Sequence, residues 1–320
     1  MKRFLNCITL AMLLLLALPT HAQATGLLVP VGQVVGLQLE NRTVTVAAFD
    51  DDAASSTQGL QVGDKILTID GKSVTCAEDV RQALRQSDGT VAVRVRRSGK
   101  EVQLRLMPQI TSDGPKLGVF LREGVTGIGT ITYYDPQTQR FGTLGHGVND
   151  ETGSILSMTG GSAYPAQVQS VRKGRSGQPG QLVGSLLSSE PFGILERNTE
   201  KGVFGTARAT FSGEAIPVGS ADTVRTGQAH IRSTVSGEAV QEYSVEILKI
   251  YPKSRANGRN MLIKVTDPAL LETTGGIVQG MSGSPIIQDG KLVGAVTHVL
   301  VNDPTTGYGI FIENMLDAAA

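Results

Sequence analysis

The sequence lacks a surplus of charge of either sign. Lysine and arginine together number 29, aspartate and glutamate together number 29, and the formal net charge is therefore zero. A chain without net charge has no long-range field that would recruit nucleic acid or an anionic membrane surface. We therefore expect no nucleic-acid partner.

Cysteine and metal-binding patterns are also scarce. The sequence has two cysteines, Cys7 and Cys76, and loss of the N-terminal segment would leave no intrachain disulfide. His146, His230 and His298 are too scattered to form a zinc pattern, and the sequence has neither a P-loop nor a dinucleotide fingerprint. These absences predict an activity that uses no metal and no cofactor.

Tryptophan is absent and long apolar runs are few, whereas glycine is frequent, with 39 residues. This combination favours short strands joined by tight turns. The 320 residues correspond to about two domains of roughly 150 residues each. Because 40% of the residues are hydrophobic and 18% are charged, we expect packed cores rather than disorder.

The first 24 residues are organised like an export signal. Lys2 and Arg3 give a positive start, residues 8–18 are apolar, and residues 22–24 (AQA) match a small-x-small cleavage site. The apolar run is shorter than the about 20 residues that a membrane-spanning helix needs. We predict a signal peptide over residues 1–24, with a retained membrane anchor as the alternative.

Residues 25–110 predict a small β-rich domain with a helix. Alternating apolar residues indicate strands at 65–69 and 91–95, and the apolar residues within 77–84 have helical spacing. The segment 59–74 (GLQVGDKILTIDGKSV) resembles the PDZ family. This resemblance implies that an extended peptide binds as an added strand beside a sheet edge.

In PDZ domains, a glycine-containing loop receives the terminal carboxylate of the peptide. The resemblance places this loop at Val34, Val35, Gly36 and Leu37, and we predict Val35, Gly36 and Leu37 as peptide-binding residues. Successive N–H groups around Gly36 would form an anion-binding nest. The alternative is a folded PDZ domain that binds no ligand.

Residues 111–320 continue with short strands separated by glycines, which predicts a sandwich or a pair of barrels. Within them, the segment 279–285 (QGMSGSP) has the Gly-x-Ser-Gly-x-Pro pattern of the nucleophile loop in chymotrypsin-like peptidases. Ser282 would be the nucleophile, and the N–H groups of Gly280 and Ser282 would form the oxyanion hole. A glycine- and serine-rich turn between strands is the alternative.

A serine nucleophile needs a base, and His146 is the candidate. It lies between two glycines in the segment 141–147 (FGTLGHG), after an alternating strand. A histidine that precedes the serine in the chain follows the chymotrypsin-like order, so His146 would take the proton of Ser282. A structural role for His146 is the alternative.

The blocks at 145–146, 198–205, 266–285 and 297–309 together resemble the stage IV sporulation protein B peptidase family. The resemblance covers nearly the whole chain after residue 24. It implies a PDZ-bearing serine peptidase that is exported into the space between the forespore and mother cell membranes. The family cleaves signalling proteins there, so we expect a protein or peptide substrate, in particular a membrane-associated sporulation signalling protein, and self-cleavage is a further expectation.

The resemblance assigns the base to His146, the nucleophile to Ser282 and the acid of the triad to Asp267. Asp267 precedes Pro268, so this pair could equally end a strand in a turn, and Glu196 and Asp150 are the alternative acids. His298 follows Ser282 by sixteen residues, where the wall of the primary substrate pocket would run, and we consider it for a pocket or orienting role.

We therefore expect a mainly β protein with a PDZ-like domain at 25–110 followed by a chymotrypsin-like double β-barrel peptidase domain at 111–320. Its predicted function is that of an exported serine endopeptidase with Ser/His acyl-enzyme chemistry and PDZ-mediated capture of a substrate or of its own tail. The alternative is a non-catalytic PDZ adaptor with a degenerate peptidase domain.

Overall fold

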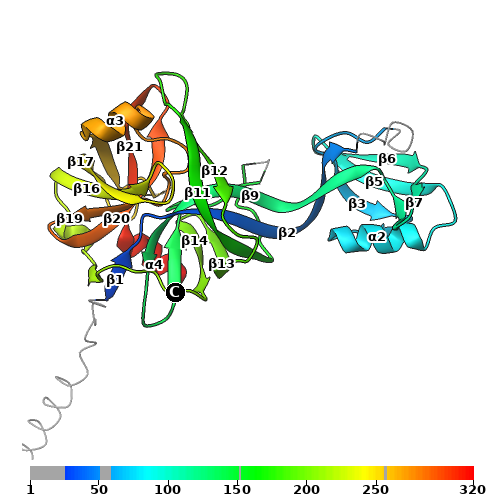
Figure 1. Ribbon diagram of the computed structural model, residues 1–320, viewed down its shortest axis with the longest axis horizontal. Helices are drawn as coiled ribbons and strands as arrows, with labels where there is room; N and C mark the ends of the chain where they lie inside the picture. The colour runs from blue at the N-terminus through cyan, green and yellow to red at the C-terminus, as the bar shows by residue number, and fades with distance from the viewer. Residues whose placement is uncertain (1–25, 51–58, 151–152, 256–257) are drawn as a thin grey trace, which may run out of the picture.

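The structure is a computed structural model that describes residues 26–50, 59–150, 153–255 and 258–320. The predicted signal peptide lies outside these residues. The described chain forms a larger lobe and a smaller lobe that are joined by two long strands (Figure 1). None of the helices in the described part of the chain is long and apolar enough to cross a membrane.

The larger lobe contains a first barrel in which the pairing of β2 with β9 closes a ring of antiparallel strands. In order around the ring, the strands are β9 (Val119–Tyr134), β10 (Arg140–Thr143), β14 (Gly202–Ala207), β13 (Gly193–Thr199), β11 (Gly160–Arg172) and β2 (Val34–Phe49). The short strands β1 (Leu27–Pro30), β15 (Ile216–Pro217) and β12 (Gln181–Leu186) extend this sheet. The barrel core is apolar, with Phe141, Ile131 and Leu195 almost completely buried.

A second closed barrel follows along the chain. Its strands, in order around the barrel, are β16 (Gly227–Thr234), β17 (Val240–Ile250), β18 (Met261–Val265), β21 (Asp303–Phe311), β20 (Lys291–Leu300) and β19 (Pro285–Gln288). The short helix α3 (Pro268–Thr274) leads from β18 toward β19, and the 3₁₀ turn η1 (Ala221–Thr223) precedes β16. The expected mainly β fold with a double barrel is therefore confirmed.

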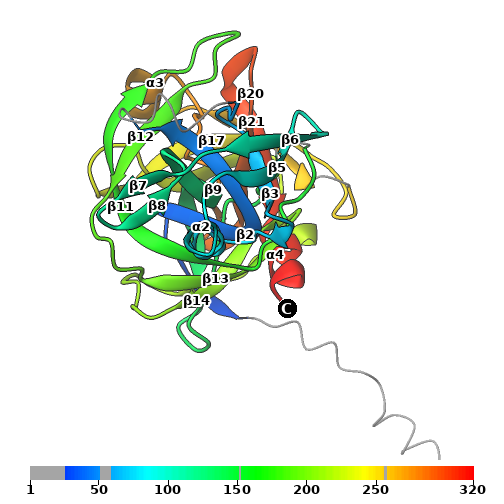
Figure 2. The same cartoon turned by 90° about the vertical axis from the view of Figure 1, so that its right-hand side faces the viewer.

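The smaller lobe is the PDZ-like domain. It contains β3 (Lys65–Ile69), β4 (Lys72–Ser73), α2 (Ala77–Arg85), β5 (Val91–Arg97), β6 (Lys100–Leu106), β7 (Gln109–Thr111) and β8 (Gly114–Lys116), together with the distal halves of β2 and β9. In β5, Val91, Val93 and Val95 are fully buried while Arg94 is exposed, which is the alternation that the sequence predicts. Figure 2 views this lobe from its outer end, with α2 seen along its axis.

The first barrel also takes strands from before residue 111, where the sequence analysis divides the two domains. Residues 34–39 of β2 already belong to the first barrel, where they pair with β9 on one side and with β11 on the other. The strands β2 and β9 then continue outward together, and the PDZ-like lobe is inserted between them. Each of these two long strands therefore serves both lobes.

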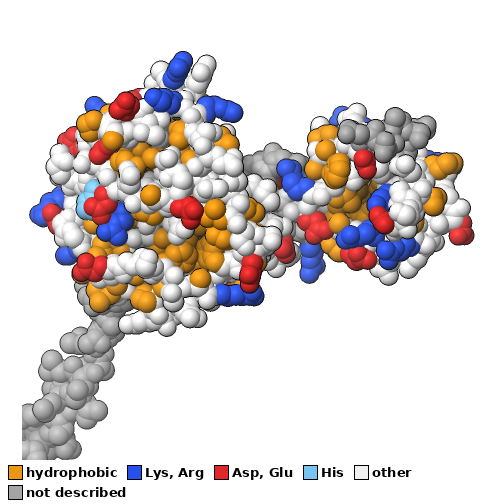
Figure 3. Space-filling view, viewed as in Figure 1, with side chains coloured by type: hydrophobic (Ala, Val, Ile, Leu, Met, Phe, Trp, Pro, Cys, Tyr) orange, Lys and Arg blue, Asp and Glu red, His pale blue; other side chains and the backbone are white. Residues whose placement is uncertain are grey.

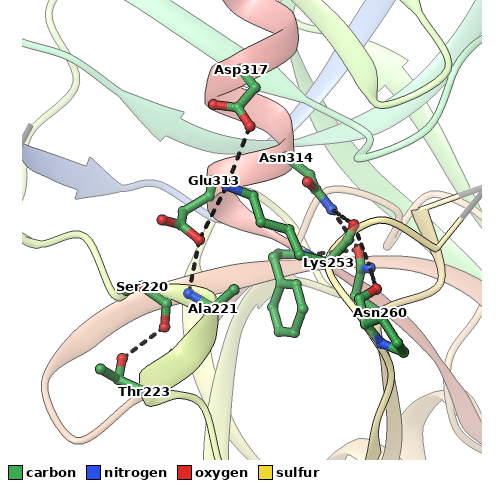
Figure 4. A network of polar contacts seen from close by, with 10 residues as sticks. Ser220, Ala221, Thr223, Lys253, Asn260, Glu313, Asn314 and Asp317 are labelled. Atoms are coloured by element: carbon green, nitrogen blue, oxygen red, sulfur yellow. Dashed lines mark hydrogen bonds and ion pairs between the residues drawn. The ribbon is translucent and has the colours of Figure 1, made fainter. Parts of the chain in front are cut away.

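The C-terminal helix α4 (Ile312–Ala319) is fastened to the base of the second barrel. Lys253 lies 3.5 Å from a carboxylate oxygen of Glu313 and 3.4 Å from one of Asp317 (Figure 4). Glu313 also accepts a hydrogen bond from the backbone N–H of Ala221. The helix covers a cluster of buried apolar residues from both barrels and thus helps to hold them together.

Candidate active site

The predicted nucleophile loop is a tight turn between α3 and β19. Gly280 and Gly283 have φ angles of +99° and +98°, a region that favours glycine. A Cβ atom at Gly283 would lie 2.0 Å from the carbonyl oxygen of Thr130, so no side chain fits there. The loop conformation thus requires the glycines of the sequence motif.

The peptides of the predicted oxyanion hole are oriented by hydrogen bonds to their carbonyl groups. Leu182 donates its N–H to the carbonyl of Gln279 at 2.8 Å, and Ser284 donates to that of Met281 at 3.0 Å. In a trans peptide, the next N–H points the opposite way from the carbonyl. Among the residues that the structure describes, the resulting N–H groups of Gly280 and Ser282 have no internal acceptor. They are available to an oxyanion without rearrangement.

The histidine loop follows the end of β10. Leu144 and Gly145 have φ angles of +69° and +67°, and this turn leads directly into His146. The side chain of Asn198 then fastens the chain after the histidine, because it accepts from the N–H of Val148 and donates to the carbonyl of Val148. Sequence reasoning included Asn198 in the family resemblance, and the structure gives it this anchoring role.

The hydrogen bond of the His146 ring assigns its tautomer. Nδ1 of His146 lies 2.9 Å from the carbonyl oxygen of Gly147. Because a carbonyl can only accept, the neutral ring carries its proton on Nδ1, and Nε2 is left as the basic nitrogen. This is the tautomer that a general base in a serine peptidase needs.

The nucleophile and the two histidines converge around β20. Ser282 Oγ donates to the carbonyl of Thr297 at 2.7 Å. His298 follows Thr297 in the chain, and the centroid of its ring lies 5.0 Å from that of the His146 ring. Within the described residues, Ser282 Oγ makes no hydrogen bond to His146, so its hydroxyl must turn away from Thr297 before His146 accepts its proton. Catalytic hydrogen bonds often tighten only when substrate is bound.

Burial keeps both histidines neutral. It lowers the pKa of His146, although the hydrogen bond to Gly147 acts in the opposite direction. Burial, followed by the charges of His146 and Arg259, lowers the pKa of His298 to about 4. Nδ1 of His298 is buried and makes no hydrogen bond to any described residue. Burial thus leaves His146 neutral at neutral pH, which is the form that a general base requires.

Asp267 is not brought to this centre by any contact in the described part of the chain. Its side chain caps α3 by accepting from the N–H of Leu270 at 3.0 Å, and it also accepts from the N–H of Ser244 at 3.3 Å. The pair Asp267-Pro268 is thus a helix start, with the acidic cap followed by proline at the first helical position. The role of Asp267 as the triad acid stays a prediction.

The alternative acids also have other partners. Glu196 accepts from Thr206 at 2.9 Å and lies 3.9 Å from Arg140. Asp150 accepts from the N–H of Ser154 at 3.3 Å. In the described structure, no hydrogen bond or ion pair joins either carboxylate to His146.

The predicted carboxylate-binding loop requires a correction. Val35, Gly36 and Leu37 form no loop, because they pair with residues 127–129 of β9 and with residues 163–165 of β11. Their backbone groups are engaged in a sheet on both sides, and a Cβ atom at Gly36 would lie 2.3 Å from Cδ2 of Leu186. They cannot receive a peptide terminus.

A groove of the kind that a PDZ domain uses lies instead between α2 and the outer end of β9. It encloses about 540 Å³ and is lined by Val80 and Leu84 of α2 and by Phe120 of β9, among others. Residues 119–123 of β9 pair with β2 on one edge, and none of the described strands pairs with their other edge. That free edge can accept an added strand.

The lining of this groove combines a glycine turn, charged side chains of both signs and exposed apolar surface. Gly118, just before β9, has a φ angle of +67°. Arg85 and Lys116 also line the groove together with Asp113, whose carboxylate lies 2.8 Å from Lys116 Nζ, and Phe120 is 59% exposed. Hydrophobic side chains gather at the centre of this lobe in the view of Figure 3. Sequence reasoning missed the groove, although residues 117–120 (LGVF) carry the glycine and apolar residues that could have identified it.

Metal binding has no support from the arrangement of the side chains. Within residues 26–50, 59–150, 153–255 and 258–320, no group of three or more histidine, cysteine, aspartate or glutamate residues could hold a metal ion.

Comparisons with known proteins agree with this architecture. A family model described as SpoIVB peptidase S55 matches residues 113–316, which is well over half of the chain. A PDZ domain model matches residues 34–107. Curated relatives named as putative zinc metalloproteases match from Rhizobium meliloti (36% identity over 27% of this chain and 23% of the relative) and Vibrio cholerae (32%, 38% and 26%). The chain thus spans about a quarter of the length of these relatives.

Solved structures give weaker likenesses. The PDZ domain of an SdrC-like protein from Listeria monocytogenes is 25% identical, with 25% of this chain and 87% of that chain covered and a TM-score of 0.22. The active form of the Rv3671c protease from M. tuberculosis is 14% identical, with 61% and 73% covered and a TM-score of 0.38.

Proposed function

Because the chain belongs to the SpoIVB peptidase S55 family and carries a PDZ domain, we propose that it is an exported serine endopeptidase that cleaves a regulatory signalling protein during sporulation. Family membership makes the chain a serine peptidase with a protein or peptide substrate. The observation that carries the proposed chemistry is the pair of N–H groups at Gly280 and Ser282 that have no acceptor among the described residues. Ser282 bonds to Thr297, and the ring of the following residue, His298, packs against that of neutral His146.

The chemistry begins when Nε2 of His146 takes the proton of Ser282 Oγ as this oxygen attacks the carbonyl carbon of the substrate peptide bond. The carbonyl π electrons move to the oxygen, and the N–H groups of Gly280 and Ser282 stabilise the resulting charge. The tetrahedral intermediate collapses as His146 returns the proton to the leaving amine. A water molecule, deprotonated by His146, then releases the acyl group and regenerates Ser282.

Orientation of the base is assigned to the carbonyl of Gly147. It holds the Nδ1 proton of His146, which is the position that the acid occupies in a Ser-His-Asp triad. The site can thus present the correct histidine tautomer without a contact from Asp267.

Substrate capture is assigned to the groove between α2 and β9. A chain end that enters it would pair with residues 119–123, and its carboxylate would lie near the turn at Gly118 and the basic side chains of Arg85 and Lys116. The captured end can belong to a membrane-associated signalling protein or to the tail of another copy, which would allow self-cleavage. Export and a place between forespore and mother cell membranes are proposed from the family resemblance.

Labelling with a fluorophosphonate distinguishes the enzyme from a non-catalytic PDZ adaptor. We expect wild-type protein to gain one phosphonyl group that peptide mapping places on Ser282, and Ser282→Ala to gain none. Ser284→Ala is the matched control, because Ser284 is buried and its Oγ lies 3.0 Å from Ser233 Oγ. An unlabelled wild type that is folded and still binds peptides in the groove would favour the adaptor.

A further inference from the structure

Thr130 occupies the contact between the barrels beside the nucleophile loop. It lies on β9 and is fully buried. Its Oγ1 donates to the carbonyl of Gly280 at 2.8 Å, and its backbone N–H donates to the carbonyl of Ser282 at 3.0 Å. One residue of the first barrel thus binds the nucleophile loop on both sides of Met281.

The backbone carbonyl of Thr130 binds the segment that leads to His146. It accepts from Thr143 Oγ1 at 2.6 Å and from the N–H of Leu144 at 3.4 Å. Leu144 lies two residues before His146. All the polar groups of Thr130 are therefore used, and they join the loop of Ser282 to the strand end that carries His146.

The fit around this junction is close. A Cβ atom at Gly283 would lie 2.0 Å from the Thr130 carbonyl oxygen and 2.6 Å from the Leu144 nitrogen. In a densely packed contact of this kind, a shift of one segment is transmitted to the other. Thr130 therefore lies where a shift of the Ser282 loop would reach the segment that leads to His146.

We propose that Thr130 is a positioning residue for the peptidase reaction, which sets the nucleophile loop against the histidine loop. The inference rests on the proposed function, because it assumes that Ser282 and His146 react together. The Oγ1 bond to Gly280 is the part that a substitution can remove, while the backbone bonds remain. A small misplacement of reacting groups can reduce a rate by about 10²-fold.

The chain provides a matched control on the same strand. Thr132 is also fully buried, but its Oγ1 makes no hydrogen bond to any described residue. Thr130→Val and Thr132→Val each exchange a buried hydroxyl for a methyl group. They differ in whether that hydroxyl binds the nucleophile loop.

The experiment measures the second-order rate of Ser282 labelling by a small fluorophosphonate, together with kcat and KM on a short peptide. Measurements are made at a temperature where thermal unfolding shows every variant to be folded. We expect Thr130→Val to lower the labelling rate and kcat roughly 10- to 100-fold with little change in KM. Thr132→Val should stay within about threefold of the wild type, and Thr130→Ser should restore most of the rate because it keeps the hydroxyl.

Unchanged labelling in folded Thr130→Val would overturn the proposal, as would an equal loss in Thr132→Val or no recovery in Thr130→Ser. If Thr130→Val does not fold, Thr130→Ser and Thr130→Ala give the same comparison, and equal rates in these two variants would also overturn it. A wild type that is not labelled at Ser282 would instead refute the proposed function, and the inference with it.

Discussion

The carbonyl oxygen of Gly147 accepts the hydrogen bond from Nδ1 of His146, and this carbonyl carries no charge. A carboxylate in this position would fix the tautomer and would also stabilise the imidazolium ion that forms during attack. A carbonyl fixes the tautomer equally well, but it stabilises the imidazolium ion only through its dipole. The described site thus relies on burial, which keeps His146 neutral before the reaction begins.

Asp267 provides a test of this view. In the structure it caps α3, and asparagine is as good a helix cap as aspartate. We therefore expect Asp267→Asn to keep the stability of the wild type and to keep kcat/KM within about tenfold. Asp267→Ala should lose about 1 kcal/mol of unfolding free energy, because the hydrogen bond to Leu270 is lost.

The measurement is a pH–rate profile of both variants beside their denaturant unfolding curves. If Asp267 is instead the triad acid, as the family resemblance implies, Asp267→Asn would lose up to about 10⁴-fold in kcat and regain some activity at high pH. That outcome would show that the acid reaches His146 only after a rearrangement of α3.

The buried histidines predict how stability depends on pH. Burial lowers the pKa of His298 to about 4 and also lowers that of His146, whereas histidine in an unfolded chain has a pKa of about 6.5. Between these values the unfolded chain binds more protons than the folded chain, so the free energy of unfolding falls as the pH decreases from about 6.5 toward 4. Protonation of carboxylates also lowers the free energy of unfolding on acidification, so the contribution of a histidine is isolated by comparing variants that differ at that histidine.

We expect His298→Gln to be destabilised less by acid than the wild type over this range, because one of the histidines that must be kept neutral is gone. His230→Gln is the control, since His230 lies half-exposed on β16, 3.8 Å from Glu242. Denaturant unfolding at pH 7 and pH 5 gives the two free energies. Parallel changes in wild type and His298→Gln would show that His298 titrates like an exposed histidine.

The nucleophile loop was predictable from sequence because its requirements are local. Gly280 and Gly283 adopt the positive φ angles that favour glycine, and Ser282 between them is the predicted nucleophile. The part played by Thr130 was not predictable in this way, since its bond to Gly280 joins residues 150 positions apart. Nothing in the residues around Thr130 distinguishes it from Thr132.

The outer edge of β9 should determine peptide capture. Phe120 lines the groove and is largely exposed, so its replacement should affect binding more than folding. We expect Phe120→Asp to weaken binding of a peptide with a free terminal carboxylate roughly tenfold, because it removes apolar contact and adds a like charge. Hydrolysis of a short peptide that does not reach the groove should change little.

Ile110→Asp is the matched control. Ile110 lies on β7 in the same lobe, is 79% exposed and does not line the groove. Calorimetric titration of the peptide into both variants provides the comparison. Equal weakening by both substitutions would argue against the groove as the binding site.

The long strands β2 and β9 explain why the fold class was predictable and the arrangement of the lobes was not. Alternation within 91–95 and the PDZ-like segment 59–74 identified the smaller domain. However, β2 crosses from one lobe into the other as one continuous strand, with only a register shift between Leu39 and Val44, so no turn signal in its sequence separates the lobes. Val35 to Leu37 were assigned to the wrong lobe for this reason, and the peptide-binding site was assigned with them.

An inserted lobe should be removable. Leu39 and Val125 are paired in the antiparallel ribbon before it leaves the first barrel. Replacing residues 40–124 by Asn-Gly would close the strands with a two-residue hairpin turn. We expect the shortened protein to fold cooperatively, to keep fluorophosphonate labelling within about tenfold of the wild type and to lose capture of the carboxylate-ended peptide. Failure to fold would mean that the lobe supports the barrels directly.

In the proposed mechanism, neutral His146 activates Ser282 beside preformed oxyanion donors. This role of His146 is tested by the pH dependence of the rate at which a small fluorophosphonate labels Ser282, in wild type and in His146→Ala. We expect a plateau at neutral pH and a fall on acidification through a pKa below 6.5, with a loss of roughly 10²- to 10⁴-fold in His146→Ala. Labelling of Ser282 at the wild-type rate in His146→Ala, or labelling at another residue, would contradict the account.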